Sequence, residues 1–264
     1  MISEKFEEQV FFTTTRITIQ TDFEKDVSVG TGFLFNVQLD DIEGKYVTLL
    51  ISNKHVFSNP FERITFNFNR KNSEGFPDFG NVFNFTKKDF SDIYFEHPDK
   101  EVDLACINAT IITFPEHNIY YRNIAPNMLS DFTEDLLVPG LDVWFVGYPE
   151  NRFDSSNNLP LMRRGYIASH PKVDFNSKKI LVIDAQVFPG SSGSPVFAPI
   201  GGNYKLIGVV SATMIKHGQL QTIPTLQSNI GVQQILGLGL VIKATAIREL
   251  IEFAVSKIKE NIKI

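Results

Sequence analysis

The sequence is poor in cysteine and in long apolar runs, and each shortage excludes a class of protein. Cys106 is the only cysteine, so no disulfide can form within the chain, which suits a reducing compartment. No run of about eighteen apolar residues occurs, so we expect no transmembrane helix and no membrane partner. The opening MISEKFEEQVFF lacks the charge layout of a secretory signal peptide. These absences together favour a soluble protein of the cytoplasm.

Clustered positive charge is also missing. The chain holds 25 Lys and Arg against 30 Asp and Glu, which gives a formal net charge of -5. Because affinity for nucleic-acid phosphates comes mainly from clustered Lys and Arg, we expect no nucleic-acid partner. The histidines form no closely spaced pair and the cysteine stands alone, so we expect neither a metal site nor a cofactor.

Short runs rich in Val, Ile, Phe and Thr indicate an all-β chain. One series of such runs ends at about residue 112 and a second begins near residue 142, with an irregular, proline-punctuated stretch between them. We therefore expect a first lobe over 1–113, a linker over 114–140 and a second lobe over 141–264. Two barrels are favoured over one open sheet, because closure removes exposed strand edges. Apolar residues at three- and four-residue steps predict a closing helix at about 246–258.

The stretch GSSGSP, residues 190–195, interrupts two apolar runs with three serines and two glycines. An ordinary turn has the same composition, since Gly, Pro and Ser are all common turn formers. The alternative is a small-residue turn that holds one serine hydroxyl at an exposed bend among backbone N–H groups, as acyl transfer requires. The choice depends on whether the chain also supplies a base and an orienting carboxylate.

Two titratable residues belong to apolar runs of the first series. His55 ends the run YVTLLISNKHVF where the chain leaves the sheet, and Asp103 lies inside the run EVDLACINA. A lone histidine is more often a surface or structural residue. A carboxylate within a strand needs partners, because burying an unpaired charge is costly. Cys106 is a weaker candidate nucleophile, because its odd spacing from Asp103 on one predicted strand points the two side chains to opposite faces.

Several segments follow one another in the order found in a known family. They are GTGFLF, SNKHV, VDLACI, FVGYP, RRGYIAS, IDAQVFPGSSGSPVF and LGLVIKATAIRELI, and they span about residues 28–255. In these segments the chain resembles the trypsin-like serine peptidases, with the HtrA-like (Deg) branch as the nearest match. The resemblance implies two six-stranded antiparallel β-barrels with a C-terminal helix, and hydrolysis of protein or peptide substrates. No PDZ-like domain is recognisable after the predicted helix, although most HtrA-like proteins carry one.

The resemblance also assigns catalytic roles to four residues. Ser192 corresponds to the family's nucleophile, His55 to its general base, and Asp103 to the carboxylate that orients the base. The backbone N–H groups of Gly190 and Ser192 correspond to the oxyanion hole. The alternative is a catalytically silent domain that binds a partner protein through the same cleft.

Substrate contacts follow from the resemblance in the same way. Gln186 corresponds to the base of the specificity pocket, where its lack of charge argues against a preference for Lys or Arg and favours an apolar or small residue. The strand that pairs with the substrate backbone corresponds to Val210, Ser211 and Ala212. The long stretch 214–237 follows that strand, and we expect it to be a lid, the binding site of a regulatory partner, or disordered.

Two serines depart from the family pattern. Ser194 replaces the second glycine of the serine motif, where a side chain would crowd or hydrogen-bond the turn. Ser191 stands where digestive trypsins carry an aspartate that pairs with a newly cleaved N-terminus, so activation by that route is not expected.

Overall fold

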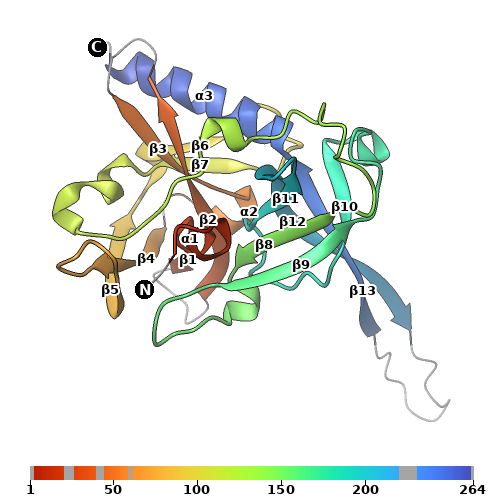
Figure 1. The fold of residues 1–264 in the computed structure, drawn as a ribbon, viewed down its shortest axis with the longest axis horizontal. Helices are drawn as coiled ribbons and strands as arrows, with labels where there is room; N and C mark the ends of the chain where they lie inside the picture. The colour runs from red at the N-terminus through yellow and green to blue at the C-terminus, as the bar shows by residue number, and fades with distance from the viewer. Residues whose placement is uncertain are drawn as a thin grey trace.

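The strands of the protein form two separate sheets in the computed structural model, which describes residues 3–20, 27–39, 45–58, 60, 62–219 and 231–262 (Figure 1). The first is a seven-stranded antiparallel sheet in the order β5-β4-β1-β2-β3-β7-β6. Its strands are β1 (Thr14–Gln20), β2 (Val27–Gln38), β3 (Tyr46–Ser52), β4 (Arg63–Lys71), β5 (Pro77–Lys88), β6 (Tyr94–Glu96) and β7 (Ala105–Asn108).

The first sheet differs from the expected six-stranded barrel in strand number and in closure. Its two edges are β5 and β6, and no β5–β6 ladder joins them among the described residues. β6 has only three residues and pairs with β7, so it offers β5 too little backbone to close the sheet. The sequence analysis missed both edge strands. β5 contains Pro77 and Gly80, which are typical of turns, next to the strand-forming Val82, Phe83 and Phe85.

The second sheet is a closed six-stranded barrel in the order β10-β13-β12-β11-β8-β9, which confirms the expectation for the second lobe. Its strands are β8 (Asp142–Gly147), β9 (Leu161–Ile167), β10 (Ile180–Asp184), β11 (Pro195–Ile200), β12 (Asn203–Gln219) and β13 (Gly231–Lys243).

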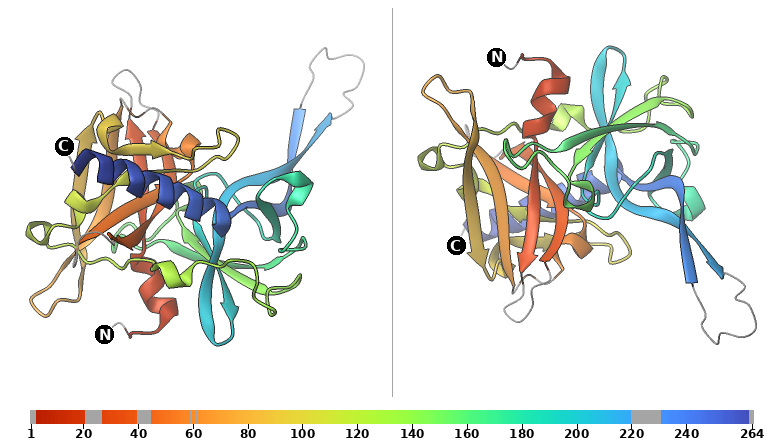
Figure 2. Two further views of the ribbon diagram at one scale, coloured as in Figure 1. Left: turned by 90° about the horizontal axis from the view of Figure 1, so that it is seen from above. Right: turned by 90° about the horizontal axis from the view of Figure 1, so that it is seen from below.

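Within the stretch 214–237, the described residues 214–219 and 231–237 all belong to strands, so these parts are not disordered. β12 runs to Gln219 and β13 begins at Gly231, and the two remain paired to their outer ends. Their outer ends project beyond the barrel in every view (Figures 1 and 2). The middle of this stretch, residues 220–230, lies outside the described residues. Its expected role as a lid or as the binding site of a regulatory partner stays a prediction.

One long helix, α3 (Ala244–Ile262), confirms the predicted closing helix and extends past it at both ends. It contacts β6 and β7 of the first sheet and β12 and β13 of the barrel (Figure 2). Glu249 of α3 accepts two hydrogen bonds from Lys179 Nζ, beside β10, and lies 3.3 Å from Nε2 of the buried His97, beside β6. The helix therefore joins the two lobes. Among the described residues, no helix is both long and apolar enough to cross a membrane.

The remaining helical elements are short. They are α1 (Phe6–Gln9), α2 (Lys54–Phe57) and the 3₁₀ helices Val10–Phe12, Ser91–Ile93, Thr110–Thr113, Pro115–His117, Pro126–Met128, Pro149–Asn151 and Phe175–Ser177. Three of these 3₁₀ helices belong to the segment between β7 and β8. This segment also bridges to β2 through Ile124 and to β12 through Leu129. The division of the chain at 114–140 stays a prediction.

The apolar core is continuous between the lobes. One cluster of buried side chains includes Phe33 and Phe35 of β2 together with Phe145 of β8 and Phe197 of β11. Because such packing resists sliding, the first sheet and the barrel are held in a fixed relation. That relation positions the residues considered next.

Candidate active site

His55 lies in α2, beyond the end of β3, where the chain leaves the first sheet. The neighbouring Val56 and Phe57 are buried and anchor this short helix, whereas the His55 side chain is half exposed. Asn53, at the N-cap of α2, donates from its side-chain amide to the Asp103 carbonyl at 2.8 Å. The local fold thus ties the histidine segment to the segment that carries Asp103.

Asp103 is not inside a strand, because β7 begins only at Ala105. It ends the turn after β6, which is closed by a hydrogen bond from the His97 N–H to the Leu104 carbonyl at 2.9 Å. Its carboxylate holds His55 at two points: Oδ2 is 2.6 Å from Nδ1, and Oδ1 accepts the backbone N–H at 3.2 Å. Burial alone would raise the pKa of Asp103, but the hydrogen bonds with His55 and Ser211 outweigh it and lower that pKa.

Ser192 is connected to this pair through Ser211 of β12. The Ser192 hydroxyl donates to the Ser211 carbonyl at 3.1 Å, and the Ser211 hydroxyl donates to Oδ2 of Asp103 at 3.2 Å. Among the described residues, Ser192 forms no hydrogen bond with His55. The three predicted catalytic residues therefore gather at one place, with Ser211 between Ser192 and Asp103.

The backbone around Ser192 is held in a shape that depends on glycine. Gly190 and Gly193 have φ of 84° and 86°, a region that other residues rarely adopt. A side chain on Gly193 would also collide with the Thr31 carbonyl. The N–H groups of Gly190 and Ser192 donate to no acceptor in the part of the chain that the structure describes. Two adjacent donors are therefore available beside the Ser192 hydroxyl.

Thr31 of β2 fastens the serine turn to the first sheet, and the sequence analysis missed it. Its N–H donates to the Ser192 carbonyl at 2.9 Å, and its hydroxyl donates to the Gly190 carbonyl at 3.0 Å. The same hydroxyl accepts the Tyr148 N–H at 3.1 Å. The available signal was the polar Thr31 between two glycines in the apolar segment GTGFLF.

Ser191 and Ser194, the two serines that differ from the family pattern, are both buried. Ser194 packs against Gly147, where any side chain would collide with the Ser194 hydroxyl. Gly147 therefore provides the space that Ser194 occupies. The Ser191 and Ser194 hydroxyls have no hydrogen-bond partner among the described residues.

The predicted substrate-contacting residues differ in exposure. Gln186 and Ala212 are exposed and Val210 is fully buried. Ser211 marks an irregularity in the β12–β13 register between Val210 and Ala212. A groove beside these residues is lined by Ser211 and Asp103 together with Val102, Ile180 and Ile242.

Cys106 lies in β7 and its side chain is fully buried in the core. Burial raises the pKa of its thiol far above the usual range, so the reactive thiolate is suppressed. The sequence-based argument that Cys106 and Asp103 point to opposite faces of one strand was wrong, because Asp103 precedes β7. Burial disfavours Cys106 as a nucleophile for a different reason.

A comparison with protein families found one match. The family model described as a trypsin-like peptidase domain matches residues 30–209, which include His55, Asp103 and Ser192. This chain belongs to the trypsin-like peptidase family. The match runs from β2 into the first part of β12, so the family segment contains most of both sheets. The assignment to the HtrA-like branch stays a prediction.

The fold of this trypsin-like peptidase family member also resembles solved structures. The crystal structure of tobacco vein mottling virus protease matches 92% of this chain and 82% of that chain, with a TM-score of 0.51 and 12% sequence identity. At this identity the similarity concerns the fold alone. No curated protein matches the sequence.

Proposed function

We propose that the chain is a serine endopeptidase that cleaves protein or peptide substrates through Ser192, His55 and Asp103. The observation that carries the proposal is the pairing of Asp103 with His55 Nδ1 at 2.6 Å beside Ser192. The Asp103 carboxylate fixes the imidazole with a proton on Nδ1, which leaves Nε2 free to accept a proton.

In the proposed reaction the Ser192 hydroxyl gives up its hydrogen bond to the Ser211 carbonyl and donates to His55 Nε2 instead. Its proton passes to Nε2 while Oγ bonds to the carbonyl carbon of the scissile peptide bond. The developing oxyanion accepts hydrogen bonds from the Gly190 and Ser192 N–H groups, which have no other acceptor among the described residues. His55 then donates the proton to the leaving amine as the C–N bond breaks, and water hydrolyses the acyl ester by the same steps.

A second function is favoured by the hydrogen bond from Ser192 to the Ser211 carbonyl. A domain that binds a partner without catalysis would keep the serine in that bond. A peptidase would give it up when substrate binds, since hydrogen bonds in catalytic sites often align only in the complex. The two functions differ in whether the hydroxyl can be activated at all.

A fluorophosphonate probe separates the two functions, because it reacts with activated serines. We expect one adduct, mapped to Ser192, which is absent in Ser192→Ala and retained in Ser191→Ala and Ser194→Ala. His55→Ala and Asp103→Asn should each lower peptide hydrolysis by about 10⁴-fold without unfolding the protein. A folded wild-type protein that neither labels nor cleaves peptides would favour the binding domain.

A further inference from the structure

A second groove adjoins the serine turn and contains an arginine. Arg16 of β1 and Val29 of β2 line it together with Glu150, Asn151 and Gly190. Gly190 supplies one of the two free N–H donors, so the groove begins at the proposed oxyanion hole. It shares no lining residue with the groove that contains Ser211 and Asp103.

The Arg16 guanidinium is held in place by uncharged groups. Nη1 donates to the Asn151 side-chain carbonyl at 2.8 Å, and Nη2 donates to that of Asn67 at 3.4 Å. The guanidinium carbon lies 4.8 Å from the centre of the Phe153 ring. The charged end of Arg16 is therefore oriented before any ligand binds, which lowers the entropy lost on binding.

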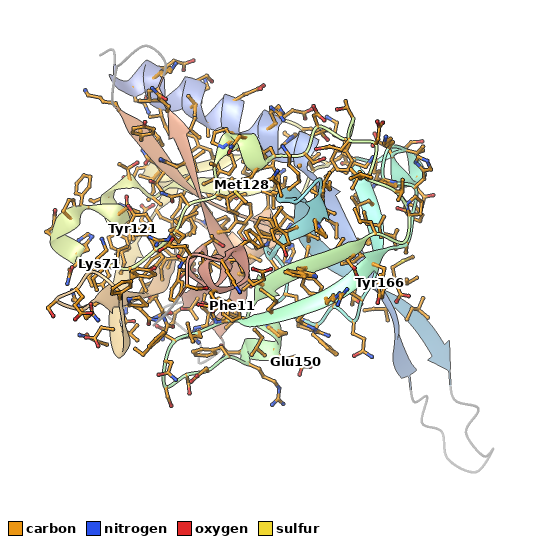
Figure 3. All side chains as sticks on the ribbon, in the orientation of Figure 1. Phe11, Lys71, Tyr121, Met128, Glu150 and Tyr166 are labelled. Atoms are coloured by element: carbon orange, nitrogen blue, oxygen red, sulfur yellow. The ribbon has the colours of Figure 1, made fainter. Side chains whose placement is uncertain are left out.

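Within the described part of the chain, this cation has no carboxylate partner. Arg16 forms no ion pair among the described residues, and its Nε is buried without an acceptor. Burial lowers the pKa of Arg16, which reflects the loss of water around the charge. Glu150, labelled in Figure 3 on the loop after β8, lies on the same groove, but its carboxylate is 3.5 Å from Nε of Arg152. A partly desolvated cation with free donors is a strong site for an anion.

We propose that Arg16 binds a carboxylate of the substrate on the leaving-group side of the scissile bond. This inference rests on the proposed function and on the family resemblance, which assigns Val210, Ser211 and Ala212 to the substrate backbone; we place the residues before the scissile bond on that strand. The residues after it then pass Gly190 into the Arg16 groove. The carboxylate belongs either to an Asp or Glu side chain just after the scissile bond, or to the free C-terminus of a substrate that ends there.

Matched quenched-fluorescence peptides test the inference. In the first set, paired peptides carry either Asp or Asn at the first, second or third residue after the scissile bond. In the second set, the peptides end shortly after the scissile bond, and each pair has either a free C-terminal carboxylate or a C-terminal amide. We expect kcat/KM to be about five- to ten-fold higher for the favoured carboxylate member, a size typical of one charge-assisted hydrogen bond at a half-buried site. The set that shows the difference identifies the source of the carboxylate.

Variants assign that preference to Arg16. Arg16→Gln should bring the ratio between the paired peptides to about one, and Arg16→Lys should retain part of it. Arg63→Gln is the matched control, because Arg63 of β4 is an exposed arginine that lines neither groove and should leave the ratio unchanged. Equal cleavage of every pair by the wild-type protein would overturn the inference while leaving the peptidase proposal intact.

Binding to Ser192→Ala provides a readout that does not depend on catalysis. Fluorescence anisotropy should give a Kd about five-fold lower for the favoured acidic peptide than for its neutral pair, and Arg16→Gln should remove that difference. If the wild-type protein neither labels nor cleaves, the proposed function fails and this measurement alone decides the Arg16 site. Equal Kd values for the paired peptides would then reject it.

Discussion

Replacing Thr31 by valine should destabilise the protein through the serine turn. The Thr31 hydroxyl donates to the Gly190 carbonyl at 3.0 Å and accepts the Tyr148 N–H at 3.1 Å, and its side chain is fully buried. Valine has nearly the same shape but neither bond, so the buried Tyr148 N–H and the partly buried Gly190 carbonyl each lose a partner. At about 1–3 kcal/mol for each unsatisfied group, partly relieved by relaxation, we expect a loss of about 2–4 kcal/mol. Thr31→Ser keeps the hydroxyl and should cost about 1 kcal/mol for the lost methyl group.

Urea denaturation measures the difference, with the fluorescence of Trp144, the single tryptophan, as the signal. All variants should carry Ser192→Ala so that self-digestion does not distort the curves. In a separate protein that keeps Ser192, Thr31→Val should also slow fluorophosphonate labelling, because the Gly190 carbonyl loses its hydrogen bond from Thr31. Equal urea midpoints for Thr31→Val and Thr31→Ser would show that these two hydrogen bonds do not stabilise the turn.

Two further predictions concern titratable groups, the partly buried Asp103 and the fully buried Cys106. The pKa of Asp103 is lowered on folding, so its ionised form stabilises the folded state above the unfolded pKa of about 4, and this stability is lost as pH falls through the lower folded pKa. The difference in urea midpoint between wild type and Asp103→Asn should therefore shrink below about pH 4, and a constant difference from pH 6 to pH 3 would contradict this. Cys106 is fully buried, so a thiol reagent should modify the native protein no faster than the protein unfolds. Rapid modification of folded protein would contradict the buried position.

Short motifs located the proposed catalytic residues because each role depends on a local arrangement. A glycine turn brings Ser192 to a bend, and SNKHV carries His55 out of a strand, so neighbouring residues suffice to find both. The backbone at Asp103 was wrongly predicted to be strand. Its pairing with His55 was nevertheless expected, because that pairing depends on the side chain and not on the secondary structure. Thr31 and Arg16 act across the lobe boundary, where sequence spacing carries no information about contact.

Edges and projections were harder to predict than the core. Ile215 and Leu236 lie on the projecting β12–β13 hairpin and are both exposed, so no burial pattern distinguishes those residues from a loop. β5 pairs with a neighbouring strand, β4, on one side only, and it contains Pro77 and Gly80, which are typical of turns. The buried strands of the barrel were predicted because their apolar residues are continuous.

The contacts of α3 with both sheets have a consequence for how the protein is made. A chain grows from its N-terminus, and domains fold as they emerge from the ribosome. β1 to β13 all precede α3 in the chain, yet α3 contacts both the sheet that carries His55 and Asp103 and the barrel that carries Ser192. The two halves of the cleft are therefore expected to reach their final relation only after residues 244–262 have been synthesised. Under the proposed function, this order of synthesis would keep a nascent chain from cleaving itself or its neighbours on the same messenger RNA.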